Sequence, residues 1–189
     1  MREDNLKLIQ KEYEADPALS HMRSEYINYV PGRGSLQPKI MIIGEAPGKW
    51  ENYHKSPFMG QSGTLLFKLM KRANFTTDNC FITNVVKYRP IDPNGDNRTP
   101  TRNEVNASLH YLMREWVIIN KPEIIIVLGN IAKSIFDIKG NITNIVGRKI
   151  RISSDKIVIP MVHPSYLLQQ PFKQEHHEKI WASLRPLSK

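Results

Sequence analysis

The chain has 189 residues and a formal net charge of +9 at pH 7, with 40% hydrophobic and 24% charged residues. These values are ordinary for a folded protein, so we expect one domain over residues 1–189, with residues 1–29 as a helical lead-in. No apolar run approaches the ~18 residues that a membrane span needs. The N-terminus also lacks an apolar signal core, so we expect an intracellular, cytoplasmic protein that does not act at a membrane.

The basic excess lies after residue 30. Such an excess suits a polyanion such as nucleic acid, although a solvated cationic surface is the alternative. The chain contains one cysteine, Cys80, which excludes an intrachain disulfide and a zinc or iron–sulfur site built from cysteines. We expect a monomer without a cofactor and without a metal.

Hydrophobic patterning predicts alternating helices and strands. A charged helix over 3–16 precedes an irregular segment over 17–39. Four apolar, β-branched runs without clean alternation predict strands buried on both faces: Ile40–Ile43, Phe81–Val86, Ile124–Leu128 and Ile157–Val162. Helical patterns cover residues 64–73, 101–116, 130–137 and 173–184. The second of these begins with Thr101 and Glu104 at the spacing of a capping box. This order predicts an α/β fold with a parallel sheet and helices on both faces.

Candidate chemical groups follow the predicted strands directly. Glu45 follows the first strand, Asn84 lies near the end of the second, Gly129 follows the third and His163 follows the fourth. Ligands of open parallel sheets bind beyond the carboxyl ends of the strands. We therefore expect these four segments to meet at one crevice.

Several local motifs allow a functional and an ordinary interpretation. The loop 44–49 does not match a P-loop, because three residues rather than four separate its glycines and Trp50 follows Lys49; an ordinary strand-to-helix turn is the alternative. An amide inside an apolar strand, as at Asn84, either bonds to backbone or reads a base edge. The adjacent histidines at 176–177 point to different helix faces, so a solvated surface is favoured over a metal site.

The segment after the last strand, residues 163–168, is the second strong feature. His163 can donate a hydrogen bond into the crevice, and Ser165 with nearby N–H groups can hold a phosphate. Leu167 is interpreted as an exposed wedge that enters a base stack. The alternative is a structural histidine in a loop. Lys87 and Arg89 add two cations near Asn84, for which plain surface charge is the alternative.

Taken together, these segments resemble the uracil-DNA glycosylase superfamily, and most closely its family 4 branch. The matching segments occur in the order of the family and cover about residues 30–170: VPGRG at 30–34, MIIGEAPG at 41–48 with Glu51, PFMGQSGTLL at 57–66, ITNVVK at 82–87 with Arg89-Pro90, Leu128-Gly129, and HPSYLL at 163–168.

The resemblance implies a three-layer α/β/α fold with a short four-stranded parallel sheet, and hydrolysis of the N-glycosidic bond of uracil in DNA. It implies that Phe58 stacks on a flipped uracil, that Asn84 pairs with the base, and that His163 stabilises the leaving group. The resemblance makes Glu45 the candidate catalytic carboxylate, with Glu51 in reserve. The implied base-binding residues are Gly44, Ala46, Gly48, Glu51, Phe58 and Asn84. The implied DNA-binding residues are Gln61, Ser62, Gly63, Lys87, Arg89, Ser165, Tyr166 and Leu167.

The sequence departs from the family pattern at three places. Family 4 members hold an iron–sulfur cluster on four cysteines, but Tyr88 stands where one is expected and residues 1–39 contain none. We expect the helix over 3–16 to pack in place of the cluster.

Ala46 and Gly48 stand where other branches carry aspartate and tyrosine, so the gate against thymine must come from elsewhere, with Glu51 as the candidate. Residues 49–56 are bulkier than the usual connector. A glycosylase for another altered base and a non-catalytic DNA-binding member of the fold are the alternative functions.

Overall fold

The computed structural model describes residues 1–188 and contains a six-stranded sheet in the order β1-β3-β2-β4-β6-β5. Its four central strands are parallel and confirm the predicted strands to within one or two residues: β2 (Ile40–Gly44), β3 (Cys80–Asn84), β4 (Ile124–Leu128) and β6 (Ile157–Met161). Two-residue strands, β1 (Arg33–Gly34) and β5 (Ile150–Arg151), pair antiparallel at the edges. The edge strands were not predicted, because two residues cannot form an apolar run.

The helices agree with the predicted segments but include three more. The α-helices are α1 (Arg2–Ala15), α2 (Lys49–His54), α3 (Gln61–Arg72), α4 (Arg102–Ile118), α5 (Gly129–Ser134), α6 (Ile142–Ile145), α7 (Pro164–Gln169) and α8 (Gln174–Ser183). Short 3₁₀ helices are η1 (Pro17–Met22), η2 (Pro171–Lys173) and η3 (Arg185–Ser188). Helices α2, α6 and α7 were not predicted. No helix within residues 1–188 has the length and apolar character needed to cross a membrane.

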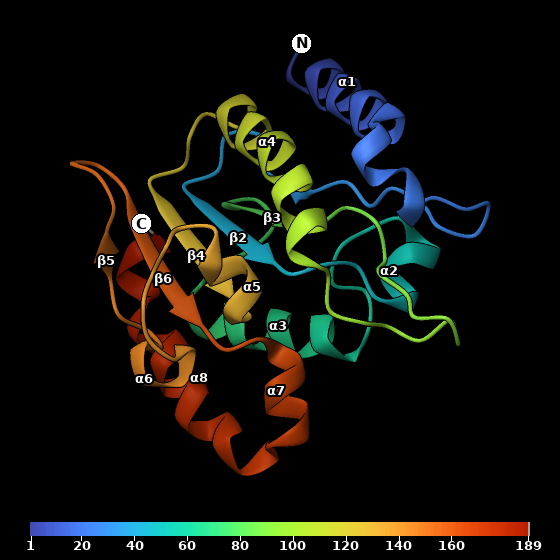
Figure 1. Cartoon of the computed structure of the whole chain (residues 1–189). Helices are drawn as coiled ribbons and strands as arrows, with labels where there is room; N and C mark the ends of the chain where they lie inside the picture. The colour runs from blue at the N-terminus through green and yellow to red at the C-terminus, as the bar shows by residue number, and fades with distance from the viewer. Residues whose placement is uncertain (189) are drawn as a thin grey trace.

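The helices cover both faces of the sheet and form three layers (Figure 1). Side chains of the fully buried β2 alternate between the two faces, with Ile40 and Ile42 on one and Met41 and Ile43 on the other. The first face packs against α3, α7 and α8, and the second against α1, α4 and α5. The predicted three-layer α/β/α fold is confirmed.

The N-terminal helix α1 is fixed to α4 through Tyr13. The Tyr13 ring makes edge contacts with Tyr29, Tyr88 and Tyr111, with ring centroids 5.0–5.3 Å apart. Its hydroxyl lies 2.8 Å from Ser108 Oγ and accepts the backbone N–H of Lys87 at 2.9 Å. Burial raises the pKa of Tyr13, so the hydroxyl stays neutral. This tyrosine cluster (Tyr13, Tyr29, Tyr88 and Tyr111) packs the lead-in against the rest of the chain.

Candidate active site

The carboxyl ends of the four parallel strands open into a pocket of about 1400 Å³. Glu45, Asn84, Gly129 and His163, which follow β2, β3, β4 and β6, all line it. Residues far apart in the sequence therefore share one cavity. The parallel direction of the strands explains this convergence, because each strand delivers its next residue to the same edge of the sheet.

Two glycines allow the pocket to form around Phe58. A Cβ atom on Gly44 would lie 2.3 Å from Asn84 Oδ1 and 2.6 Å from Phe58 Cζ, so only glycine permits this close approach. A Cβ atom on Gly63 would lie 1.9 Å from the carbonyl oxygen of Phe58. Phe58 itself has a φ of 56°, a left-handed conformation that is strained for an aromatic residue. Its ring centroid lies 6.1 Å from that of His163, with an interplanar angle of 31°.

The Asn84 side chain is buried, with 4% exposure, and lines the pocket. Its amide makes no hydrogen bond with any other residue in 1–188. Both amide atoms keep some contact with the solvent in the pocket, so the missing partner costs less than it would for a fully enclosed amide. Its unused donor and acceptor are available to a ligand in the pocket.

The Glu45 carboxylate is half-buried in the pocket wall, and over residues 1–188 it has neither a hydrogen bond nor an ion pair. Burial raises the pKa of this carboxyl group, because removal from water disfavours the charged form. The negative charge of Glu45 therefore faces the pocket without compensation by a neighbouring cation.

His163 presents a single N–H group to the pocket. Its Nδ1 accepts the backbone N–H of Ser165 at 3.2 Å and lies 2.8 Å from Ser165 Oγ. In the neutral ring the proton is therefore on Nε2, which has no partner within residues 1–188. Burial lowers the pKa of His163 to about 4, so the imidazole is neutral at pH 7.

Glu51 connects two loops of the site. Its Oε2 accepts the N–H of Gly48 at 3.1 Å, and its Oε1 accepts the N–H groups of Met59 and Gly60 at 2.9 and 3.0 Å. These bonds join the loop after β2 to the loop that carries Phe58. The arrangement supports a positioning role for Glu51 over the reserve catalytic role.

Three residues expected at the DNA surface lie in the interior instead. Lys87 is 0% exposed, and its Nζ donates to Glu115 Oε2 at 2.7 Å and also to Thr83 Oγ1. Leu167 is 0% exposed and packs in the core, because residues 164–169 form helix α7 and not a loop. Gly63 is buried against the Phe58 backbone. The expected DNA contacts of Lys87, Leu167 and Gly63 were therefore wrong.

The other expected positions lie at or beside the pocket. Its lining includes Ala46, Gly48, Gln61, Ser62, Ser165 and Tyr166. Arg89 is half-buried, and its guanidinium donates to Asn97 Oδ1 at 2.5 Å and to the carbonyl of Gly95 at 2.9 Å. The exposed residue of α7 next to the pocket is Leu168, at 37% exposure.

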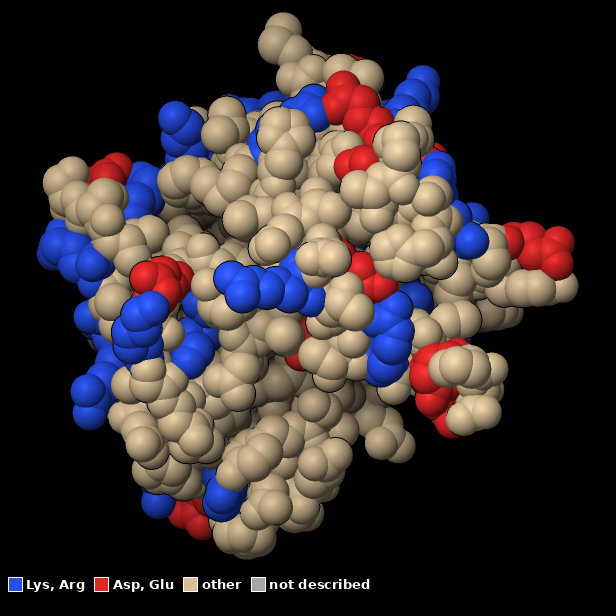
Figure 2. Space-filling view, viewed as in Figure 1, with Lys and Arg blue, Asp and Glu red and all other residues tan. Residues whose placement is uncertain are grey.

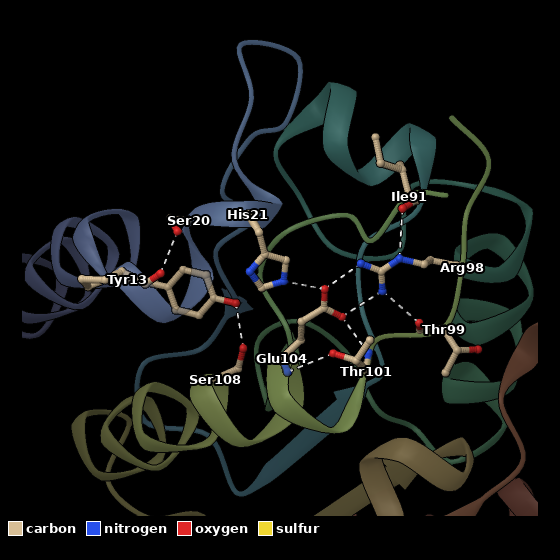
Figure 3. Close-up of polar contacts among 10 residues, drawn as sticks. Tyr13, Ser20, His21, Ile91, Arg98, Thr99, Thr101, Glu104 and Ser108 are labelled. Atoms are coloured by element: carbon tan, nitrogen blue, oxygen red, sulfur yellow. Dashed lines mark hydrogen bonds and ion pairs between the residues drawn. The ribbon is translucent and has the colours of Figure 1, made fainter. Parts of the chain in front are cut away.

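Sequence reasoning missed two parts of the pocket lining, the segments 97–99 and 141–143. Figure 3 shows the contacts that hold Arg98 in the first of them. Arg98 in this wall donates to both Glu104 oxygens, at 2.8 and 2.6 Å. Glu104 also accepts the N–H of Thr101 at 2.7 Å, which confirms the predicted capping box, and lies 3.0 Å from His21 Nε2. The Arg98 guanidinium is the main reason that the pKa of Glu104 falls to about 2. The N-terminal lead-in thus supports the pocket wall through His21.

Comparison with known proteins agrees with this architecture. A family model described as the Uracil DNA glycosylase superfamily matches residues 31–185. The chain belongs to this superfamily. It is 42% identical over 144 residues to the Type-4 uracil-DNA glycosylase of Thermotoga maritima, covering 75% of this chain and 72% of that protein. The corresponding protein of Pyrobaculum aerophilum is 38% identical (80% and 79% covered), and that of Archaeoglobus fulgidus is 34% identical (85% and 82% covered).

The residues of this chain cannot bind the iron–sulfur cluster that the resemblance to family 4 implies. A cluster of that kind requires four cysteine thiolates. The chain has one cysteine, Cys80, which is buried in β3 with a pKa raised to about 12 by desolvation. Tyr88, at the position of an expected cysteine, packs against Tyr13 and Tyr29. Aromatic packing of α1 therefore occupies this region of the described chain.

Proposed function

We propose that this protein is a monofunctional DNA glycosylase, which flips uracil out of DNA and hydrolyses its N-glycosidic bond to leave an abasic site. The observation that carries the proposal is the set of unpaired polar groups from Glu45, Asn84 and His163 in one pocket beside the Phe58 ring. The names of the relatives support the same activity.

Base recognition follows from the chemistry of Asn84 and Phe58. A base within a duplex must leave the stack to reach such a pocket. The Asn84 amide would accept uracil N3–H and donate to uracil O4, while the Phe58 ring stacks on the base. Cytosine presents the reverse pattern at these two positions, which would leave the buried amide unpaired. A site built on such hydrogen bonds rejects the wrong base strongly.

The leaving group is stabilised by the neutral His163 ring. As the bond between the sugar C1′ and uracil N1 breaks, its electron pair moves to the base, and negative charge spreads onto the uracil oxygens. The Nε2–H group of His163 donates to the developing oxyanion. Because this donor is already oriented by Ser165 in a half-buried site, little reorganisation is needed during the reaction.

Glu45 completes the reaction on the sugar side. The sugar develops oxocarbenium character as the base departs, as in glycoside hydrolysis. The uncompensated Glu45 carboxylate stabilises this positive charge or orients the water that attacks C1′. The water oxygen forms the new bond to C1′, and its proton balances the charge of the departing uracil anion.

The remaining surface suits a DNA substrate. On the face seen in Figure 2, Lys and Arg side chains extend along the left side and across the centre, whereas acidic side chains form smaller separate groups. With the net charge of +9, this surface attracts the phosphate backbone. We infer that the lead-in and the body form one domain, since Tyr13 and His21 join them through hydrogen bonds.

The direct test is release of uracil from uracil-containing oligonucleotides, with abasic sites revealed by alkaline cleavage. We expect cleavage with the wild type and a large loss with Glu45→Ala. Asn84→Asp should change base preference, because a carboxylate lacks the amide donor. A panel of other deaminated bases tests the alternative specificity. Salt-sensitive DNA binding without release of any base would replace the proposal by a non-catalytic binding function.

A further inference from the structure

The outer surface of α2 carries aromatic side chains that the fold does not use. The large aromatic side chains exposed within residues 1–188 are Tyr26, Trp50, Tyr53 and Phe172, at 76%, 57%, 73% and 78% exposure. Two of them, Trp50 and Tyr53, lie on the six-residue helix α2. Exposure of such rings to water is unfavourable, and a contiguous exposed group of them indicates a binding surface.

The rings of α2 form a continuous strip. The His54 ring is stacked on Trp50, with centroids 6.3 Å apart and an interplanar angle of 24°. It also meets the edge of Tyr53, with centroids 5.0 Å apart. We call Trp50, Tyr53 and His54 the aromatic platform. Trp50 also lines the active-site pocket, and its Cδ1 lies 3.4 Å from the position of a Cβ atom built on Gly60. The platform is therefore continuous with the pocket mouth.

The platform is held rigidly from below. The buried Asn52 side chain accepts the N–H of Asn28 at 2.8 Å and donates to the carbonyl of Tyr26 at 2.8 Å. Glu51 binds the backbone of Gly48, Met59 and Gly60, as described above. The inner residues of α2 are thus anchored, and its outer rings are presented without a need to order the helix on binding.

The charges around the platform favour an anionic partner. Lys49 and Lys55 flank it in the sequence, and both are exposed. The only carboxylate of α2 is Glu51, which is turned inward and bound to three backbone N–H groups. Glu25 bonds to the neighbouring Tyr26, so we leave Tyr26 out of the platform. Aromatic rings combined with cations match the bases and phosphates of single-stranded nucleic acid.

We propose that the aromatic platform stacks the unpaired bases of single-stranded DNA next to the nucleotide in the pocket, and so favours single-stranded substrates. The identity of the base in the pocket rests on the proposed function. The stacking of neighbouring bases on the platform does not depend on it. In a duplex the flanking bases are already paired and stacked, so the platform has fewer open base faces to bind.

The test uses the full chain and a fluorescein-labelled oligothymidine that contains no uracil. We expect Trp50→Ala and Tyr53→Ala each to raise the Kd for this single strand by about tenfold at fixed salt, the scale of one base–aromatic stack. Trp50→Phe should retain most of the affinity, because it keeps a ring. The matched control is Val117→Ala on α4, whose side chain is similarly exposed at 52%; it should bind like the wild type.

A second measurement separates the inference from the proposed function. On a uracil-containing single strand, the Trp50→Ala/Tyr53→Ala variant should show a raised KM with a nearly unchanged kcat, and a smaller change on the matching duplex. If the wild type releases no uracil but the variants lose single-strand affinity, the proposed function fails and the platform stands. Unchanged Kd and KM in the double variant would overturn the proposed role of the platform. Equal losses of affinity for single-stranded and double-stranded DNA would also overturn it. So would a loss of affinity in Trp50→Phe as large as that in Trp50→Ala.

Discussion

Two groups of buried and half-buried polar side chains lie at or near the pocket, and they differ in whether their members have protein partners. Behind the pocket, Lys87 is paired with Glu115, and in the pocket wall Arg98 is paired with the buried Glu104. In the pocket, Asn84 and Glu45 have no protein partner within residues 1–188. Asn84 and Lys87 are only three positions apart in the sequence, so burial alone does not distinguish the groups. Pairing does, because a buried group with a partner holds the fold whereas one without a partner is available to a ligand.

Substitutions in the two groups should also change the free energy of unfolding differently. Removal of one member of a paired set leaves an uncompensated charge and destabilises the fold. An unpaired group at the pocket makes no bond that holds the fold, so its removal should change stability little while it abolishes function. The variants below test whether the two regions respond in these opposite ways.

The largest effect on activity is expected at the unpaired carboxylate. Glu45→Gln keeps the shape of the side chain but removes the charge that faces the sugar. We expect kcat for uracil release to fall by about 10³-fold, within the range of a positioned acid–base group. The free energy of unfolding should not decrease, since a carboxylate with a raised pKa is removed. Single-turnover kinetics and urea unfolding measure both; a loss of stability together with activity would contradict the comparison.

The opposite response is expected at the paired lysine. Lys87→Met removes the charge but keeps the length of the side chain, and it leaves Glu115 buried without its cation. We expect a loss of about 3–5 kcal/mol in the free energy of unfolding. Arg89→Met, two residues away on a half-buried side chain, should lose less than about 1 kcal/mol. Urea unfolding makes the measurement, and the Lys87→Met/Glu115→Leu variant should recover stability. Equal unfolding free energies for Lys87→Met and the wild type would mean that the buried pair is not stabilising.

A smaller, pH-dependent effect is expected at Glu104. Its pKa is about 2 in the folded protein and ordinarily 4.5, so the folded state favours the ionised form. The stability from this shift is fully present above pH 4.5 and is lost as the pH falls toward 2. Thermal unfolding of Glu104→Gln should differ most from the wild type above pH 4.5, and the difference should shrink in more acidic buffer. A difference independent of pH would show that the Arg98 pairing does not shift this group.

The pH dependence of activity gives the mildest test. Since the pKa of His163 is about 4, this ring is neutral from pH 5 upward and should cause no inflection near pH 6.5. The acidic limb of kcat/KM should instead follow the raised pKa of Glu45 and disappear from the residual activity of Glu45→Gln. If the kcat/KM profile instead showed an inflection near pH 6.5 that disappeared in His163→Asn, the His163 ring would not be neutral at pH 7.

The sequence predicted the framework of the fold because its signals are local. Each central strand is an apolar run, and Thr101 with Glu104 forms a readable helix start. Helices α2 and α7 were missed because glycine, proline and polar residues mark their beginnings as loops. That error also placed Leu167 on the surface, since a helix turns adjacent residues to different sides.

The candidate site could be predicted only in part. The order of the strands brings Glu45, Asn84 and His163 to one edge, and this follows from parallel topology. Lys87 was assigned to the surface because no local pattern reveals that Glu115, 28 positions later, pairs with it inside the protein. The role of His21 in the pocket wall depends likewise on tertiary packing, since it lies 83 positions before Glu104.

The most direct test is the paired measurement of uracil release and unfolding for Asn84→Leu, which removes the unpaired amide but keeps the number and branching of the side-chain heavy atoms. We expect the single-turnover rate of this variant to fall by about 10²-fold, the scale of one lost preorganised hydrogen-bonding group. The free energy of unfolding should change little, because the amide forms no hydrogen bond with residues 1–188. An Asn84→Leu protein that releases uracil at the wild-type rate would contradict the account.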